Sequence, residues 1–236
     1  MIDIRPFEGL AHRDHGWLDT RYHFSFSDYM DPQRMGWGRI RVWNDDKIAP
    51  RSGFPPHSHS DMEIVTFVRT GAVSHKDSLG NTGRTGAGDV QAMSAGTGVT
   101  HAEYNVESED TTIFQIWILP DRAGGDSGLG PSWGMREFPG GERAGRWEIV
   151  ASGEPEKDGA LPIRSDARIL AATLPAGETV TYAASPSRHQ YLVATGGRIR
   201  INGAEANARD GIAVTGEQAI AVEALEDCEL VMVDAR

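Results

Sequence analysis

The sequence contains a single cysteine, Cys228, so no disulfide can form within the chain. A lone thiol is typical of proteins from reducing compartments. No apolar run approaches the roughly 20 residues that a membrane-spanning helix needs. The first residues include Asp3 and Arg5 and lack the apolar core of a secretory signal. We therefore expect a cytoplasmic protein with no membrane partner.

Basic residues are few relative to acidic ones. The chain has 23 lysines and arginines against 34 aspartates and glutamates, which gives a net charge of −11 at pH 7. Binding to nucleic-acid phosphates or to anionic lipid requires basic patches. Direct nucleic-acid binding is therefore not expected, whereas the acidic balance is compatible with a basic protein partner.

Glycine is plentiful, and it separates short runs in which apolar residues alternate with others. The chain has 28 glycines among 236 residues, and 39% of its residues are hydrophobic. This pattern favours a globular, mostly β protein. The length allows one large domain or two of common size.

Two short motifs in residues 53–105 carry the clearest chemistry. His57 and His59 are two residues apart, and so are His101 and Glu103. Residues two apart in a strand share a face. If the two strands lie side by side in a small barrel, three imidazoles and one carboxylate converge, and this is a ligand set for a divalent transition metal.

Glu63 is a second candidate carboxylate ligand, because strict alternation from His57 places it on the same face as the histidines. A closed structural zinc site is a further alternative. Such sites are usually rich in thiolates, and the only thiol of this chain is the distant Cys228. An ion with open coordination positions is therefore the better hypothesis.

The other histidines of the first half are not expected to be ligands. His12, His15 and His23 occur in an aromatic-rich N-terminal segment that we expect to be irregular and to cover a face of a barrel. His75 follows the predicted turn at Gly71 and is expected to be exposed in a hairpin.

A pocket wall is predicted from the apolar run 113–119. Gln115 and Trp117 lie on one face of this strand, and a polar group between apolar neighbours suits a substrate pocket, although Trp117 could equally be plain core. Phe26 is a further candidate for a substrate contact, since its ring faces either the core or the pocket mouth.

The second half repeats the general plan of short strands and glycine turns. The glycine-rich segment 121–131 reads as a crossing between domains, and Asn202-Gly203 reads as a hairpin turn. His189 is the only histidine after His101, so the second half is expected to be structural.

In the first half, a strand that we expect to begin at residue 38 should end at the polar residues 44–46.

The motifs resemble those of a known superfamily. The series His57, His59, Glu63 and Gly71, followed by Gly98, His101 and Asn105, resembles the two signatures of the cupin superfamily. More narrowly, residues 93–98, the sequence His101-Ala-Glu103 and the upstream segments 12–18 and 24–26 resemble the pirin family. The likeness covers nearly the whole chain and is closest to bacterial pirin-like proteins described as quercetin 2,3-dioxygenases.

This resemblance implies an all-β fold of two cupin-type β-barrels in tandem, a bicupin, with a metal in the N-terminal barrel only. We expect the metal-binding barrel in residues 1–130 and a degenerate barrel in residues 131–236. An internal pair of barrels lessens the need for a partner copy, so a monomer is expected.

The resemblance also implies a ligand set and a cofactor. The ligands would be His57, His59, His101 and Glu103, with Glu63 hydrogen-bonded to a ligating imidazole. The cofactor would be one divalent transition metal, iron in the first place, with nickel, copper, cobalt, zinc and manganese as alternatives.

The activity implied is that of a quercetin 2,3-dioxygenase. A flavonol such as quercetin would lose the proton of its 3-hydroxyl, with Glu103 as the candidate base, and react with dioxygen to give a depside and carbon monoxide. Whether Glu103 is a ligand, a base or both stays open. One alternative is a metal-binding, redox-sensing partner of regulatory proteins, and another is a cupin isomerase or a binding protein for a small oxygen-rich molecule.

Overall fold

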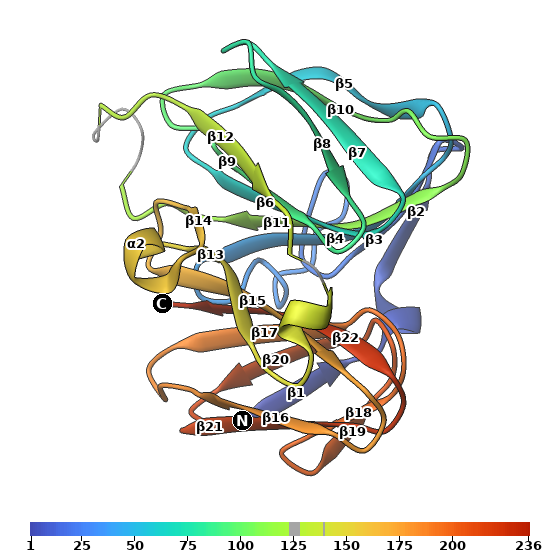
Figure 1. The fold of residues 1–236 in the computed structure, drawn as a ribbon, viewed down its shortest axis with the longest axis vertical. Coiled ribbons are helices and arrows are strands. Elements are labelled where there is room, and N and C mark those ends of the chain that lie inside the picture. Colours follow the sequence, from blue (N-terminus) through green and yellow to red (C-terminus); the bar gives the residue numbers. More distant parts are fainter. Residues whose placement is uncertain (123–127, 139) are drawn as a thin grey trace.

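The computed structural model describes residues 1–122, 128–138 and 140–236, most of them in short strands and turns. Four sheets lie in layers, with a seven-stranded and a four-stranded sheet in each half of the molecule (Figure 1). Each pair of sheets encloses its own interior. The expected all-β fold with two barrels is confirmed. The crossing predicted at 121–131 lies partly outside the described residues.

The first barrel consists of strands from the first 136 residues. Its seven-stranded sheet has the order β12-β9-β6-β11-β4-β3-β2, and its four-stranded sheet has the order β5-β10-β7-β8. The strands are β2 (Ala11–Asp14), β3 (Leu18–Tyr22), β4 (Ile40–Ile48), β5 (Ser52–His59), β6 (Glu63–Thr70), β7 (Ala72–Asp77), β8 (Thr82–Gly86), β9 (Val90–Ser94), β10 (Val99–Asn105), β11 (Thr111–Ile118) and β12 (Ser132–Arg136).

The second barrel contains the remaining strands, including the first one of the chain. Its sheets have the orders β1-β20-β17-β22-β15-β13-β14 and β16-β21-β18-β19. The strands are β1 (Ile2–Arg5), β13 (Glu148–Ser152), β14 (Leu161–Pro162), β15 (Ala167–Leu174), β16 (Thr179–Ala183), β17 (His189–Ala194), β18 (Ile199–Ile201), β19 (Ala204–Ala206), β20 (Gly211–Thr215), β21 (Ala219–Ala224) and β22 (Cys228–Ala235).

Within the described ranges, the helical segments are single turns, namely η1 (Phe7–Gly9), η2 (Gly140–Arg143) and α2 (Pro155–Asp158). Across residues 1–122, 128–138 and 140–236, no helix has the length and apolar character needed to cross a membrane.

The N-terminal segment is more regular than expected. It forms β1, β2 and β3, and β1 pairs with β20 of the second barrel. In turn, β12 pairs with β9 of the first barrel. These two pairings cross the boundary at residue 130, and the division into 1–130 and 131–236 remains a prediction.

The predicted end of a strand at residues 44–46 is wrong, because β4 continues to Ile48. Asp45 and Asp46 are buried, yet both have partners. Asp45 accepts hydrogen bonds from Arg69 and Arg209, and Asp46 accepts one from Thr20. The paired carboxylates can therefore occupy a strand interior that local sequence assigns to a turn.

The main core lies between the two seven-stranded sheets. Strand alternation sends Trp43, Phe67 and Phe114 from the first barrel toward Tyr191 and Val231 of the second. The second barrel has its own apolar interior, which includes Leu192, Ile212 and Met232. The two barrels therefore share one buried face, and the other side of the first large sheet faces the interior of its own barrel.

The Asp46 carboxyl should make stability depend on pH. Burial raises its pKa to about 7, while the hydrogen bond from Thr20 opposes that rise and the nearby Asp45 adds to it. The folded pKa thus exceeds the unfolded value of about 3.9, so this contribution is fully present below about pH 4 and is lost as the pH rises through about 7. Thermal melts should show Asp46→Asn to be more stable than the parent at pH 8, with the difference vanishing toward pH 4.

The matched variant is Asp45→Asn, which weakens the ion pairs with Arg69 and Arg209 and should lower the melting temperature at both pH values. A pH-independent difference for Asp46→Asn would contradict the assignment.

Candidate metal centre

The two histidine motifs lie on neighbouring strands. β10 pairs with β5, and the register places His101 opposite His57 and Val99 opposite His59. The register shifts between His101 and Glu103. Alternation along β10 then turns both of these side chains inward, where both are buried. The sequence thus brings three imidazoles to one place through strand pairing alone.

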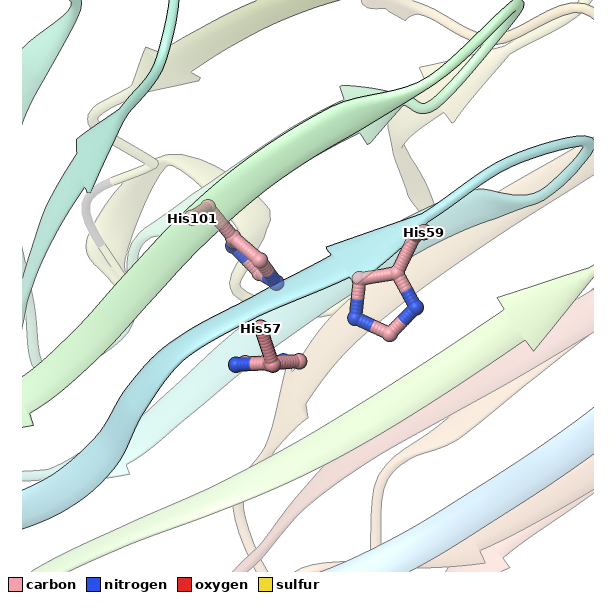
Figure 2. A group of neighbouring side chains, drawn as sticks. All are labelled: His57, His59 and His101. Atoms are coloured by element: carbon pink, nitrogen blue, oxygen red, sulfur yellow. The ribbon is translucent and has the colours of Figure 1, made fainter.

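The three rings form a compact cluster (Figure 2). One nitrogen of each ring lies within 4.8 Å of a nitrogen of the other two. The ring centres of His57, His59 and His101 are 4.5 to 5.0 Å apart. His57 Nδ1–H donates a hydrogen bond to the carbonyl oxygen of Pro55 at 2.8 Å, and this bond orients the His57 ring.

The surroundings of His59 and His101 keep these two imidazoles neutral. Burial and then the nearby His57 and His59 lower the pKa of His101 to about 3. Burial and then His57 lower the pKa of His59 to about 4. Both ring nitrogens of the buried His101 lack a hydrogen-bond partner within the described part of the chain. Neutral imidazoles with free lone pairs are the form that binds a metal ion.

Glu103 lies deeper in the barrel among neutral donors. Its Oε1 accepts hydrogen bonds from Gln91 at 2.6 Å and from Thr66 at 3.3 Å, and its Oε2 accepts one from Gln115 at 2.8 Å. Burial raises the pKa of Glu103 to about 7, and the bonds from Gln115, Thr66 and Gln91 work against that rise. The carboxyl is therefore near its titration point at neutral pH.

His75 was expected to be exposed, and this prediction is wrong. The residue is 3% exposed and faces the barrel interior from β7, directly across from Glu103 on β10. Its ring stacks on Trp133, with centres 4.6 Å apart, and its Nε2 lies 3.2 Å from Asp77. Ligand atoms of His75, His101 and Glu103 lie within 4.8 Å of one another. Alternation from the buried Val73 would have indicated this position.

Glu63 has other partners than the expected imidazole. Its Oε2 accepts hydrogen bonds from the Ser94 hydroxyl at 2.5 Å and from the Arg164 backbone N–H at 3.0 Å. No bond from Glu63 to His57, His59 or His101 occurs among the described residues. Its carboxylate instead links the start of β6 to the second barrel.

The three predicted substrate residues do lie next to the cluster. Trp117 contacts the ring of His59 edge-on, with centres 4.9 Å apart, and Phe26 contacts Trp117 in the same way at 5.4 Å. Gln115 bridges the two regions, because it accepts a bond from the Trp117 indole N–H at 3.3 Å and donates to Glu103. An aromatic wall thus flanks the imidazoles.

The remaining N-terminal histidines lie elsewhere. His12 pairs with Asp19 on the surface, and His23 is buried against Tyr191 at the face shared by the barrels. A pocket of about 610 Å³ lined by Arg164, Arg168 and Arg188 contains no histidine. The side chains that could hold a metal ion therefore lie in the first barrel.

The donor set fits a divalent metal ion. Three imidazoles and a carboxylate are borderline and hard ligands, respectively, and they would leave open positions on an ion that takes five or six. The free nitrogens of the buried His101 are the structural observation that supports this fit.

Sequence comparisons agree with this geometry. The family model named Pirin matches residues 5–118, and the model of the quercetinase C-terminal cupin domain matches residues 149–235. A pirin-like protein of Caulobacter vibrioides is 58% identical over 100% of both chains. The chain belongs to the pirin family. Another pirin relative, named quercetin 2,3-dioxygenase in Escherichia coli K12, is 38% identical over 99% of this chain and 98% of its own.

Solved pirin structures show the same fold. The crystal structure of YhhW from Escherichia coli is 38% identical, covers 100% of this chain and 98% of its own, and superposes with a TM-score of 0.93. A second structure of that bacterial pirin, in complex with nickel(II), is 37% identical, covers 100% of this chain and 99% of its own, and gives a TM-score of 0.91. A divalent metal is thus consistent with the His and Glu cluster.

The cluster makes a direct prediction for this pirin. His101→Ala should lower the affinity for nickel(II) or cobalt(II) by at least about 100-fold, because it removes the most buried imidazole of the cluster. Chelator competition measures the change. The matched control is His12→Ala, which removes an exposed imidazole far from the cluster and should bind as the parent does. Equal affinity of both variants would place the metal elsewhere.

Proposed function

We propose that this pirin is a metal-dependent dioxygenase that cleaves a flavonol such as quercetin and releases carbon monoxide. The observation that carries the proposal is the contact between the His59 imidazole and the Trp117 indole. It sets an aromatic surface beside the open side of the candidate metal centre, where a flat, oxygen-rich ring system can lie within reach of the ion.

The proposed ligands are His57, His59, His101 and Glu103, with iron(II) as the first candidate and nickel, copper, cobalt, zinc and manganese as alternatives. A bound divalent ion supplies Lewis-acid polarisation and a template for a chelating oxygen substrate. The two outer imidazoles are half-buried and the other two ligands are buried. A bound ion would therefore be reached by a substrate from the side of the two half-buried imidazoles.

Glu103 is the proposed acceptor of the flavonol 3-hydroxyl proton. Its raised pKa, caused chiefly by burial, matches the range in which a general base works near neutral pH. Gln91 and Gln115 each donate a hydrogen bond to one oxygen of Glu103, and these bonds fix the orientation of the carboxylate. Once the proton is removed, both atoms of dioxygen enter the depside, and one carbon of the heterocycle leaves as carbon monoxide.

Turnover should depend on the ligands and on the base separately. Metal-loaded parent protein should consume oxygen and release carbon monoxide when quercetin is added. His101→Ala and Glu103→Ala should lose metal and turnover together. Glu103→Gln keeps the size of the side chain but replaces one acceptor oxygen with an amide donor and cannot accept the proton, so at a metal content equal to that of the parent it should lose at least about 100-fold in kcat.

An oxygen electrode and gas analysis give the readout, with His12→Ala as the matched control. Quercetin-dependent oxygen uptake by a metal-free His101→Ala protein would contradict the proposed mechanism. A fully metal-loaded parent with no oxygen uptake would favour the alternative, a metal-dependent binding partner of regulatory proteins. Product formed without oxygen consumption would indicate an isomerase.

The aromatic wall should act on substrate binding more than on chemistry. Trp117→Ala removes a ring that contacts both His59 and Phe26, and aromatic contacts of this kind contribute about 0.5–1.5 kcal/mol beyond area burial. We expect KM for quercetin to rise about 10-fold with a smaller change in kcat. Trp117→Phe, which keeps a ring, should lie near the parent, and an unchanged KM for Trp117→Ala would remove Trp117 from the pocket.

A further inference from the structure

His75 is a buried imidazole that the proposed ligand set does not use. It is directly opposite Glu103 across the β7–β10 pair, and Asp77 is directly opposite His101. The His75 and His101 rings have centres 5.4 Å apart. A buried histidine beside the candidate metal centre needs a reason, because burying an unpaired polar group is destabilising.

The hydrogen bonds of Asp77 fix which nitrogen of His75 carries the hydrogen. Its Oδ1 accepts from the backbone N–H groups of Leu79 and Asn81 at 2.9 and 3.0 Å, and its Oδ2 accepts from the Asn81 amide at 2.9 Å. Asp77 is thus an acceptor anchored by its own turn. The contact at 3.2 Å is therefore a donation from His75 Nε2–H. The other nitrogen, Nδ1, is left with a free lone pair.

Trp133 and Gly83 fix the plane of the His75 ring. The indole of Trp133 stacks on the imidazole at an interplanar angle of 7°. A Cβ at Gly83, which pairs with His75, would lie only 2.2 Å from the Trp133 ring. The absence of a side chain at Gly83 is what allows the stack. The ring of His75 is thus clamped on one side while its Nδ1 remains unpaired.

His101 needs an acceptor for the N–H of its second ring nitrogen. A ligating histidine almost always donates its second ring N–H to an acceptor, and this bond sets its tautomer and basicity. Both nitrogens of His101, and His75 Nδ1, have no hydrogen-bond partner among the residues that the structure describes. Both oxygens of Glu103 already accept bonds from amide side chains. The free acceptor beside His101 is therefore the Nδ1 of His75.

We propose that His75 is a positioning residue which accepts a hydrogen bond from His101, so that Asp77, His75 and His101 form a relay ending at the metal. The ligand atoms of the two rings lie within 4.8 Å, a gap that one bridging water or a small ring rotation closes. Every proton is accounted for: His75 donates to Asp77, His101 donates to His75, and the remaining lone pair of His101 faces the ion. The inference rests on the proposed metal centre.

Two substitutions separate this relay from simple packing. His75→Phe keeps a ring to stack on Trp133 but has no acceptor, whereas His75→Asn loses the ring and keeps a polar atom near the place of Nδ1. If the relay holds, His75→Phe weakens cobalt(II) or nickel(II) binding about 10- to 100-fold and shifts the visible bands of the cobalt protein at saturation. His75→Asn should then lie closer to the parent in both measurements.

The control on the same strand is Ser74→Ala, whose side chain is directed to the other face. If His75→Phe instead bound metal like the parent and His75→Asn bound it more weakly, the role of His75 would be packing, and the proposal would be overturned. Parent-like affinity and cobalt spectra for both variants would overturn it as well. His57→Ala distinguishes the underlying proposal: if it too binds metal as the parent does, the centre itself is misplaced.

If His75→Phe does not fold, Asp77→Asn provides the second measurement. Its amide keeps an acceptor for the turn but can donate to His75 Nε2, which reverses the relay. The cobalt spectrum should change with little loss of thermal stability, and an unchanged spectrum would count against the relay.

Discussion

The constraint on which the site depends is the burial of a carboxylate inside a closed barrel. Strand alternation places Glu103 in the interior once His101 faces inward. A buried carboxylate is tolerated only with hydrogen-bond donors around it. Thr66, Gln91 and Gln115, from β6, β9 and β11, provide them. These donors carry no charge, so none of them compensates the negative charge of the ionised carboxylate, and a bound cation could do so.

The two barrels divide two tasks between them. The interior of the second barrel is filled by side chains such as Leu192, Ile212 and Met232, whereas much of the first interior is given to polar groups. Polar interiors contribute less hydrophobic stabilisation. The broad apolar face between the two large sheets, with Trp43 and Tyr191 in contact, lies outside both interiors. The first barrel can thus keep a reactive interior because much of its apolar burial occurs on its outer face.

Much of the site follows from period-two alternation and could be predicted. His57 with His59, and Gln115 with Trp117, share faces as the sequence indicates. His75 was assigned to an exposed hairpin because it follows the turn at Gly71, although alternation from Val73 places it on the buried face of β7; that it lies opposite Glu103 is set by the pairing with β10. The acidic residues of β4 were assigned wrongly because their partners, which include Arg209 for Asp45 and Thr20 for Asp46, are distant in sequence. Long-range partners decide such cases.

The four candidate ligands differ in how deeply they are buried. His57 and His59 are half-buried, while His101 and Glu103 are almost fully buried. The deep ligands are held by packing and hydrogen bonds before any ion arrives, which limits the ordering cost of binding. The half-buried His59 contacts Trp117, so a guest that bound an ion held by these imidazoles would also meet the aromatic wall. A substrate with adjacent oxygens on a flat ring system meets both features at once, and this is the physical argument for a flavonol-like guest.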